Sequence, residues 1–241
     1  MDALIYSAMA GADRAMRAQQ VHANNLANAA TPGFRADIEL ATSQTVAGYG
    51  YDARHMSQLQ ANAVSGRSGT VVATGRELDA AIAGDGYFAV AYGEGEAYTR
   101  SGAFTLDAEG TLQLNGRTVL GESGPIVLPP TSHITIGDDG TISVQSEGNA
   151  LMQPVDKLKL VKPAAGDLAK NEAGFIVSRS GAPLPTSDTV TVRGGHLEGS
   201  NVSAVEEMVS TMNLNRDFEM QMKLFKAADD MASNGNRLIR E

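Results

Sequence analysis

The feature that most constrains this chain is a helical pattern at both ends around a long middle segment with a strand pattern. Residues 2–28 contain no Pro and one Gly, and they are rich in Ala, Met, Leu, Gln and Arg, which favour helix. Small or apolar residues recur there at alternating steps of four and three, a heptad stripe typical of helices that pack along one face. The stripe consists of Ile5, Met9, Ala12, Met16, Gln19, Ala23 and Leu26, and the polar Gln19 interrupts it.

A turn is predicted directly after this helix. Residues 30–33 are Ala-Thr-Pro-Gly, where the proline disfavours helical backbone in the residue before it and the glycine permits a positive φ. Phe34 follows as an apolar anchor, and Asn25 and Asn28 are expected to cap or bridge backbone groups at the helix end. The alternative is an ordinary helix stop with a buried Phe.

The C-terminal segment is predicted to be helical as well. Ser203 and Glu206 have the spacing of a capping box, and Gly235 is expected to weaken or end the helix. Met208, Met212 and Met222 flank the predicted heptad stripe. That stripe consists of Thr211, Leu214, Phe218, Gln221, Phe225, Ala228, Ala232 and Ile239.

Between these ends, short runs of Val, Ile, Leu, Thr and Tyr alternate and are cut by Gly and Asp. Residues 134–144, 111–120 and 87–100 each have two such runs around a turn sequence, which predicts three β-hairpins. Asn115-Gly116 suits a type I′ turn. Further strands are predicted at residues 157–161, 174–177 and 190–192. The spacing predicts an antiparallel all-β domain.

The predicted fold class is α+β, with an antiparallel all-β central domain flanked by terminal helices that pair as a coiled coil on assembly. The segment before the β domain, residues 49–75 in particular, is poor in bulky apolar residues and is interpreted as an extended connector. The predicted division is an N-terminal helix and turn over 1–34, a connector over 35–77, the β domain over 78–196 and a C-terminal helix over 197–241.

Isolated helices are marginal in water, so the terminal helices are expected to be poorly ordered in a lone monomer. They would pair with each other and then pack against neighbouring copies or partners, and an interface of this kind that does not close produces a helical filament. The alternative is that both helices fold back onto the β domain as ordinary core helices.

Composition excludes several classes of function. The chain has 19 Lys and Arg against 28 Asp and Glu, a net charge of −9, which disfavours binding to nucleic acid or to anionic lipid. No run of apolar residues is long enough for membrane insertion, and no cleavable secretory signal is recognised. With no Cys and four scattered His, the sequence predicts no metal site, no cofactor and no catalytic residues.

Two sequence motifs point to a known family. Residues 24–35, NNLANAATPGFR, resemble the NNLANxxTxGF[KR] signature of bacterial flagellar rod and hook proteins. Residues 197–202 (LEGSNV), 205–208 (VEEM) and 216–219 (RDFE) are similar to the matching C-terminal signature. The two motifs lie at opposite ends of the chain in the family order, and residues 1–6 and 218–223 are most similar to the proximal-rod members.

The resemblance implies a non-enzymatic axial subunit of the flagellar rod, in the basal body and across the periplasm. Such proteins leave the cytoplasm through the flagellar type III export apparatus without a cleaved signal, form an inner coiled-coil layer and transmit torque. The implied partners are other rod proteins and copies of the same chain. The expected assembly residues are Ile5, Met9, Met16, Asn25, Leu26, Asn28, Thr31, Pro32, Gly33, Phe34, Leu197, Glu198, Ser200, Asn201, Val202, Met208, Met212, Phe218, Glu219 and Phe225.

Three alternatives stay open at this point. The chain could be a distal-rod or hook-type paralogue, or, in another class, a secreted β-domain enzyme or carbohydrate-binding module with helical extensions. The low aromatic content of 5% and the absence of Trp weaken the enzyme and carbohydrate-binding hypotheses. The segment 198–202 could be a simple turn from strand to helix, with Asn201 or Ser203 as the cap.

Overall fold

The computed structural model describes residues 2–45, 55–146, 151–164, 166–171 and 174–240. The chain forms two compact units, each built from segments that are distant in the sequence. Unit 1 comprises Met1–Ala27, Asp37–Asn62 and Ser203–Glu241, and unit 2 comprises Asn28–Ala36 and Ala63–Val202. Among the described residues, no helix is both long and apolar enough to cross a membrane.

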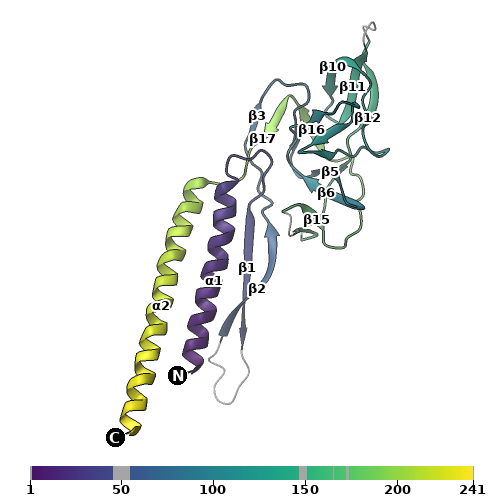
Figure 1. Cartoon of the computed structure of the whole chain (residues 1–241). Helices are drawn as coiled ribbons and strands as arrows, with labels where there is room; N and C mark the ends of the chain where they lie inside the picture. The colour runs from purple at the N-terminus through teal and green to yellow at the C-terminus, as the bar shows by residue number, and fades with distance from the viewer. Residues whose placement is uncertain (1, 46–54, 147–150, 165, 172–173, 241) are drawn as a thin grey trace. The chain divides into compact units, whose positions relative to one another are not determined.

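Unit 1 contains the two predicted helices, which are confirmed. Helices α1 (Asp2–Ala27) and α2 (Ala204–Arg240) lie side by side (Figure 1). They are antiparallel, because His22 contacts Glu207 near one end of the pair while Gly11 lies beside Gln221 farther along. The expected break at Gly235 is wrong: α2 continues through it, since one glycine inside a helix costs only about 1 kcal/mol relative to Ala.

The face of α1 that packs inside unit 1 is offset by one residue from the predicted stripe. Ala8, Ala15 and Ala18 are buried, whereas Met9 and Met16 are 57% and 52% exposed. Small side chains let two helix backbones approach closely, and a methionine at the same place would hold them apart. The side chain of Ile5 lies outside the described part of the chain.

On α2 the predicted stripe is confirmed. Its positions from Thr211 to Ala232 are less exposed than their neighbours, and Ala228 is fully buried. The side chain of Ile239, the last predicted position, is outside the described part of the chain. Met208, Met212 and Met222, which flank the stripe, are exposed.

Unit 1 also contains strands β1 (Asp37–Thr45) and β2 (His55–Val64), which form a two-stranded sheet. Strand β3 (Val71–Ala73) follows in unit 2. The described part of residues 35–77, the predicted extended connector, therefore consists largely of paired strands. Part of that connector, residues 46–54, lies outside the described residues.

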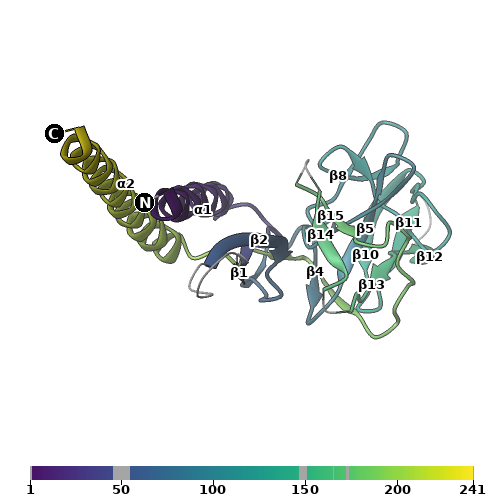
Figure 2. The ribbon, with the colours of Figure 1, turned by 90° about the horizontal axis from the view of Figure 1, so that it is seen from below.

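The strands of unit 2 pair antiparallel throughout the described residues, which confirms the predicted class of the β domain. Figure 2 shows several of these strands, among them β10, β11 and β12, which form one sheet. Their bounds are β4 (Ala80–Ala83), β5 (Tyr87–Tyr92), β6 (Gly95–Thr99), β7 (Thr105–Leu106), β8 (Leu112–Leu114), β9 (Arg117–Thr118), β10 (Thr131–Ile136), β11 (Thr141–Ser146), β12 (Gln153–Lys157), β13 (Leu160–Val161), β14 (Leu168–Lys170), β15 (Ile176–Ser178), β16 (Thr191–Gly194) and β17 (His196–Glu198).

The three predicted hairpins are present as β5–β6, β8–β9 and β10–β11. Asn115 and Gly116 have φ of 51° and 76°, the positive values that a type I′ turn requires at both central residues. In the β5–β6 hairpin Tyr92 pairs with Gly95, so the turn is shorter than the predicted residues 93–96.

Long-range pairing brings the end of unit 2 back to its beginning. Strand β17 pairs with β3, with Leu197 opposite Val72, and β16 pairs with β4. The core nearby includes Phe88 and Phe104, whose rings meet edge to face with centroids 5.3 Å apart. This pairing fixes the position of the residues that precede α2 in the sequence.

Candidate functional site

The two sequence signatures meet in unit 2. The segment after α1, residues 28–36, lies against the segment before α2, residues 196–202. The backbone N–H of Gly33 donates to the carbonyl of Glu198 at 2.7 Å, and the N–H of Asn201 donates to the carbonyl of Phe34 at 3.3 Å. We call these two segments together the junction.

A glycine is required at the turn of the junction. Gly33 has a φ of +69°, and a Cβ built there would lie 2.0 Å from the backbone nitrogen of Ser101. The loop after β6 therefore closes on the backbone of the turn, with no room for a side chain. The N–H of Phe34 completes the turn by donating to the carbonyl of Thr31 at 3.2 Å.

The side chain of Asn201 joins the two segments of the junction to each other and binds a third segment to them. Its Oδ1 accepts from the N–H of Ala36 at 2.8 Å, and its Nδ2 donates to the carbonyl of Arg67 at 2.8 Å. The cap of α2 is Ser203, whose Oγ accepts from the N–H of Glu206 at 3.4 Å. The sequence allows either Asn201 or Ser203 as the cap of α2. In the structure the cap is Ser203, because the side chain of Asn201 bonds to the backbone of Ala36 and Arg67 instead.

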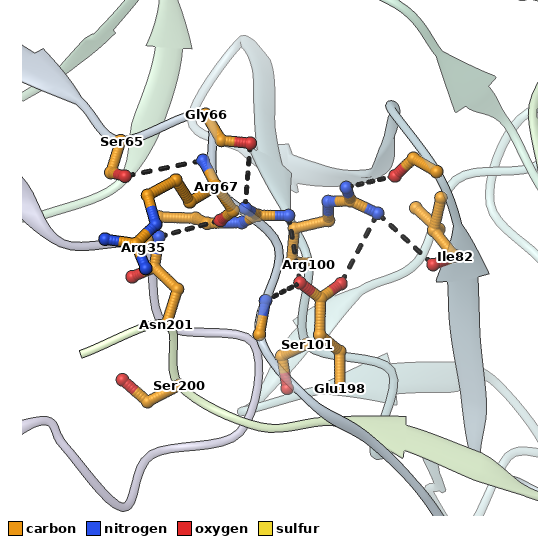
Figure 3. A network of polar contacts seen from close by, with 12 residues as sticks. Arg35, Ser65, Gly66, Arg67, Ile82, Arg100, Ser101, Glu198, Ser200 and Asn201 are labelled. Atoms are coloured by element: carbon orange, nitrogen blue, oxygen red, sulfur yellow. Dashed lines mark hydrogen bonds and ion pairs between the residues drawn. The ribbon is translucent and has the colours of Figure 1, made fainter. Parts of the chain in front are cut away.

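Three buried charges lie at the centre of the junction. Figure 3 shows the Glu198 carboxylate between the guanidinium groups of Arg35 and Arg100. The distance from Arg35 to Glu198 Oε1 is 2.9 Å, and that from Arg100 to Oε2 is 3.4 Å. All three residues are at most 2% exposed. The backbone N–H of Gly69 adds a hydrogen bond to Oε1 at 2.8 Å.

Both arginines also donate to backbone carbonyls. Arg35 reaches Gly66 at 3.2 Å, and Arg100 reaches Ile82 at 3.4 Å and Gly84. Burial lowers the pKa of Arg100, the neighbouring Arg35 lowers it further, and Glu198 opposes the shift. The one carboxylate therefore holds two like charges together in a buried site, at a large desolvation cost.

A second polar contact group lies in unit 1. Asn25 is buried, and its amide makes both hydrogen bonds with the backbone of Asp37: Nδ2 donates to the carbonyl at 3.0 Å and Oδ1 accepts from the N–H at 2.8 Å. Its Nδ2 also donates to Glu207 Oε1 at 3.4 Å, and His22 pairs with the other oxygen of Glu207. The expected bridging of backbone groups by Asn25 is thus confirmed, and it ties α1 to both β1 and α2.

The structure separates the remaining expected assembly residues into two sets. The junction contains Asn28, Thr31, Pro32, Gly33, Phe34, Leu197, Glu198, Ser200, Asn201 and Val202. The helices contain Met9, Met16, Leu26, Met208, Met212, Phe218, Glu219 and Phe225, of which all four methionines and Glu219 are exposed.

Two residues of the buried ion pairs at Glu198 are not among the residues predicted from the sequence. Arg35 ends the N-terminal signature but is not one of the predicted assembly residues, and Arg100 lies far from either signature in the sequence. A charged residue at the end of a motif is a weak signal of burial, and Arg100 at the end of a predicted strand gives none. Only the tertiary structure places them on Glu198.

We expect the stability of unit 2 to fall between pH 10 and pH 12. Burial raises the pKa of Tyr98 from 10.0 to about 12, so in this range the unfolded chain releases a proton that the folded chain keeps. At about 1.4 kcal/mol per pKa unit, the loss at pH 12 is about 2–3 kcal/mol, and it is absent below pH 10. Urea unfolding at several alkaline pH values measures it. Tyr98→Phe, which also loses the hydrogen bond from the Leu184 N–H, should flatten this part of the pH profile.

Three segments of the chain match known protein families. Residues 5–35 match the family described as flagella basal body rod protein, residues 81–144 the FlgE/F/G D1 domain of flagellar hook proteins, and residues 193–238 the C-terminal family of flagellar basal body rod FlgEFG proteins. The first and last of these matches include the two sides of the junction.

Full-length relatives agree with these matches. The chain is 38% identical to the flagellar basal-body rod protein FlgF of Escherichia coli and 36% identical to that of Salmonella typhimurium, over 99% of each chain. It is 31% identical to the flagellar basal-body rod protein FlgG of Bacillus subtilis over 94% of this chain and 95% of the relative.

Paired terminal helices, a β unit between them and a buried junction of the flanking segments define a structural subunit of the rod and hook type. The chain belongs to the family of flagellar basal-body rod proteins, with full-length similarity to FlgF. It is a structural component of the proximal rod in the flagellar basal body.

Proposed function

We propose that this protein is exported by the flagellar type III apparatus without a cleaved signal and assembles through its terminal helices into the rod across the periplasm. There it contacts other rod proteins and copies of itself and transmits torque. Its role is structural and not catalytic. The residues expected from the sequence to form the assembly contacts keep that role in this proposal.

The exposed apolar surface of the helix pair supports assembly through the helices. Its members are Met9 and Met16 on α1 and Val205, Met208, Val209, Met212, Met220, Met222, Leu224 and Met231 on α2. We call this set the methionine surface. The inner faces of both helices are already packed inside unit 1, so these side chains are available to neighbours. Exposed side chains of this size can be buried by a partner, and methionine adapts to irregular partner surfaces.

The junction supports the transmission of torque. Unit 1 and unit 2 are linked by the backbone at residues 27–28, 36–37, 62–63 and 202–203. The segments next to the links at 36–37, 62–63 and 202–203 are held together by the ion pairs of the buried Glu198 and by the hydrogen bonds of Asn201. A force passing along the chain between the units would act on several backbone segments bound to one another and not on a single free strand.

We expect two added charges on the methionine surface to abolish motility without unfolding the protein. In the double variant Met212→Glu and Met220→Glu, both exposed side chains become charged, so the monomer loses little while an apolar interface must bury two carboxylates. The swimming-zone diameter in a strain with only this variant should fall to that of the deletion, with the melting temperature of the purified protein within about 2 °C of wild type.

The matched control is Gln153→Glu with Thr189→Glu, which adds the same charge to exposed polar positions of unit 2, outside both helices. This variant should swim at or near the wild-type rate. If both double variants swim alike, the methionine surface is not the assembly surface and this part of the proposal fails.

Amide exchange tests the expectation that the helices become ordered on assembly. In the purified monomer, the backbone amides of α1 and α2 should exchange at least about a hundredfold faster than those of β5, because helices held by few apolar contacts open locally. Mass spectrometry of peptides after deuterium labelling measures this difference. Protection of both helices equal to that of β5 in the lone monomer would contradict the expectation.

A further inference from the structure

Strand β3 in unit 2 leaves one of its two edges open. It lies beside β17 (Figure 1), and on that side the backbone N–H of Thr74 donates to the carbonyl of Gly195 at 2.8 Å. Alternate residues of an antiparallel strand bond to the same partner, so the N–H and C=O groups of Val71 and Ala73 point away from β17. Within the described part of the chain, no other strand pairs with β3.

The composition of β3 favours pairing at this edge. Residues 70–74 are Thr-Val-Val-Ala-Thr, a run without charge or proline. Val71 and Val72 are 41% and 59% exposed. An exposed strand of β-branched residues is a template for another strand, and natural proteins usually protect such an edge.

Two other strands of unit 2 do have such protection. Strand β12 contains Pro154, which has no N–H to donate, and its pairing with β11 is interrupted by a bulge. On β10, the N–H of Ile134 is already bonded to the Glu77 carboxylate at 3.0 Å. Strand β3 has no proline, bulge or charged residue of this kind, so we looked for a partner that fits its sequence.

The best fit is the same strand of a second copy. Residues 67–77 read RSGTVVATGRE, with Gly and Thr placed symmetrically on the two sides of Val72. Two antiparallel copies centred on Val72 would place Val71 of each opposite Ala73 of the other. These are the residues whose backbone groups point outward, so each opposed pair can exchange both N–H···O bonds.

Charges at the two ends of this segment favour the antiparallel arrangement. The side chain of Arg67 is exposed, and that of Glu77 is 48% exposed. Antiparallel pairing brings Arg67 of each copy to the end where Glu77 of the other lies, whereas parallel pairing would bring like charges together. Arg76, at the same end as Glu77, already pairs with Asp79 of its own copy at 3.6 Å.

We propose that two copies of the chain, outside the rod, pair antiparallel through the open edges of β3 about a twofold axis at Val72. Because both copies use the same surface, the contact closes at two copies and does not continue into a filament. The inference goes beyond the proposed assembly function and does not depend on it. A contact made by one short strand is small, so the dimer is weak and depends on concentration.

A disulfide across the twofold axis tests both the contact and its register. The chain has no Cys, so Val72→Cys introduces one thiol per copy. In the proposed register the two Val72 residues form a non-hydrogen-bonded pair with Cα atoms about 4.5 Å apart, which a disulfide can span. The purified full-length variant is oxidised with diamide, and the covalent dimer is followed with time on non-reducing gels.

The matched control is Val127→Cys, at a valine of unit 2 that is 54% exposed and lies outside β3. We expect Val72→Cys to form the covalent dimer at least about tenfold faster than this control, because the strand pair holds its two sulfurs within bonding distance. A rate no greater than that of Val127→Cys would overturn the inference.

Two changes at Arg67 test the contribution of charge. In the Val72→Cys protein, Arg67→Glu should slow the cross-link at least about threefold, because two attractive contacts between the copies become repulsive. Arg67→Lys keeps the charge and should leave the rate close to that of Val72→Cys alone. Equal rates for the two changes, in proteins that melt alike, would contradict the proposed pairing.

A third variant separates this contact from the methionine surface. Adding Met212→Glu and Met220→Glu to Val72→Cys should leave the cross-linking rate unchanged, because these methionines lie on α2 in unit 1. A rate reduced to that of Val127→Cys would assign the dimer to the helices and overturn the inference. The swimming of the methionine variant, by contrast, tests only the proposed assembly function.

Discussion

Glu198→Gln should destabilise unit 2 by about 3–5 kcal/mol, the usual cost of removing one partner from a buried ion pair. The glutamine has the same shape, but it leaves Arg35 and Arg100 as two like charges in a place with almost no exposure to water. Since whole domains are stable by only about 5–15 kcal/mol, a large part of the stability should disappear. Urea unfolding followed by the near-ultraviolet circular dichroism of the tyrosines measures it.

The control for this variant is Glu94→Gln at the exposed β5–β6 turn, which removes the same charge from the surface. It should change the unfolding free energy by less than about 0.5 kcal/mol. A loss below about 1 kcal/mol in Glu198→Gln would mean that the buried charges are compensated by other groups, and the junction would then not depend on Glu198.

Gly33→Ala should be the second severe change, with an expected loss of about 2–5 kcal/mol. The left-handed backbone costs an L-residue about 1–2 kcal/mol, and the new methyl group would overlap the backbone nitrogen of Ser101, 2.0 Å from the ideal Cβ. The atoms nearest to the new methyl group belong to the backbone of Arg100 and Ser101 and not to a flexible side chain. The turn or the loop after β6 therefore has to move. Thermal and urea unfolding of the purified variant measure this loss.

Gly75 provides a matched control, because its φ of +70° is nearly the same and nothing lies within 4 Å of an added Cβ. Gly75→Ala should therefore cost only the backbone part, about 1–2 kcal/mol. The difference between the two variants isolates the steric conflict with Ser101. Equal losses in the two proteins would show that the close approach at Gly33 relaxes freely.

Both severe variants act on the same feature, the contact between the two family signatures. If the junction transmits force between the units, variants that weaken it should reduce swimming even at temperatures where the purified protein stays folded. The methionine surface is a separate requirement, because charges placed on it should block assembly while leaving the junction intact.

The elements that local sequence determines were predicted well. Hairpins β8–β9 and β10–β11 join strands through short turns, so alternation and turn residues such as Asn115-Gly116 specify both pairing and register. The two helices follow from composition and from the Pro and Ser signals at their ends. The stripe of α2 was found because its apolar residues are large, whereas on α1 the packed face consists of alanines that look like surface residues.

The pairing of segments distant in the sequence could not be predicted from the chain alone. Strand β3 joins β17, about 125 residues later, and no local pattern specifies such a partner. The terminal helices, the β-rich middle and the two signatures follow from local sequence patterns. That the two signatures meet at Arg100 follows from the fold, because a buried charge is stable only where its partners converge in space, and this convergence depends on the whole chain.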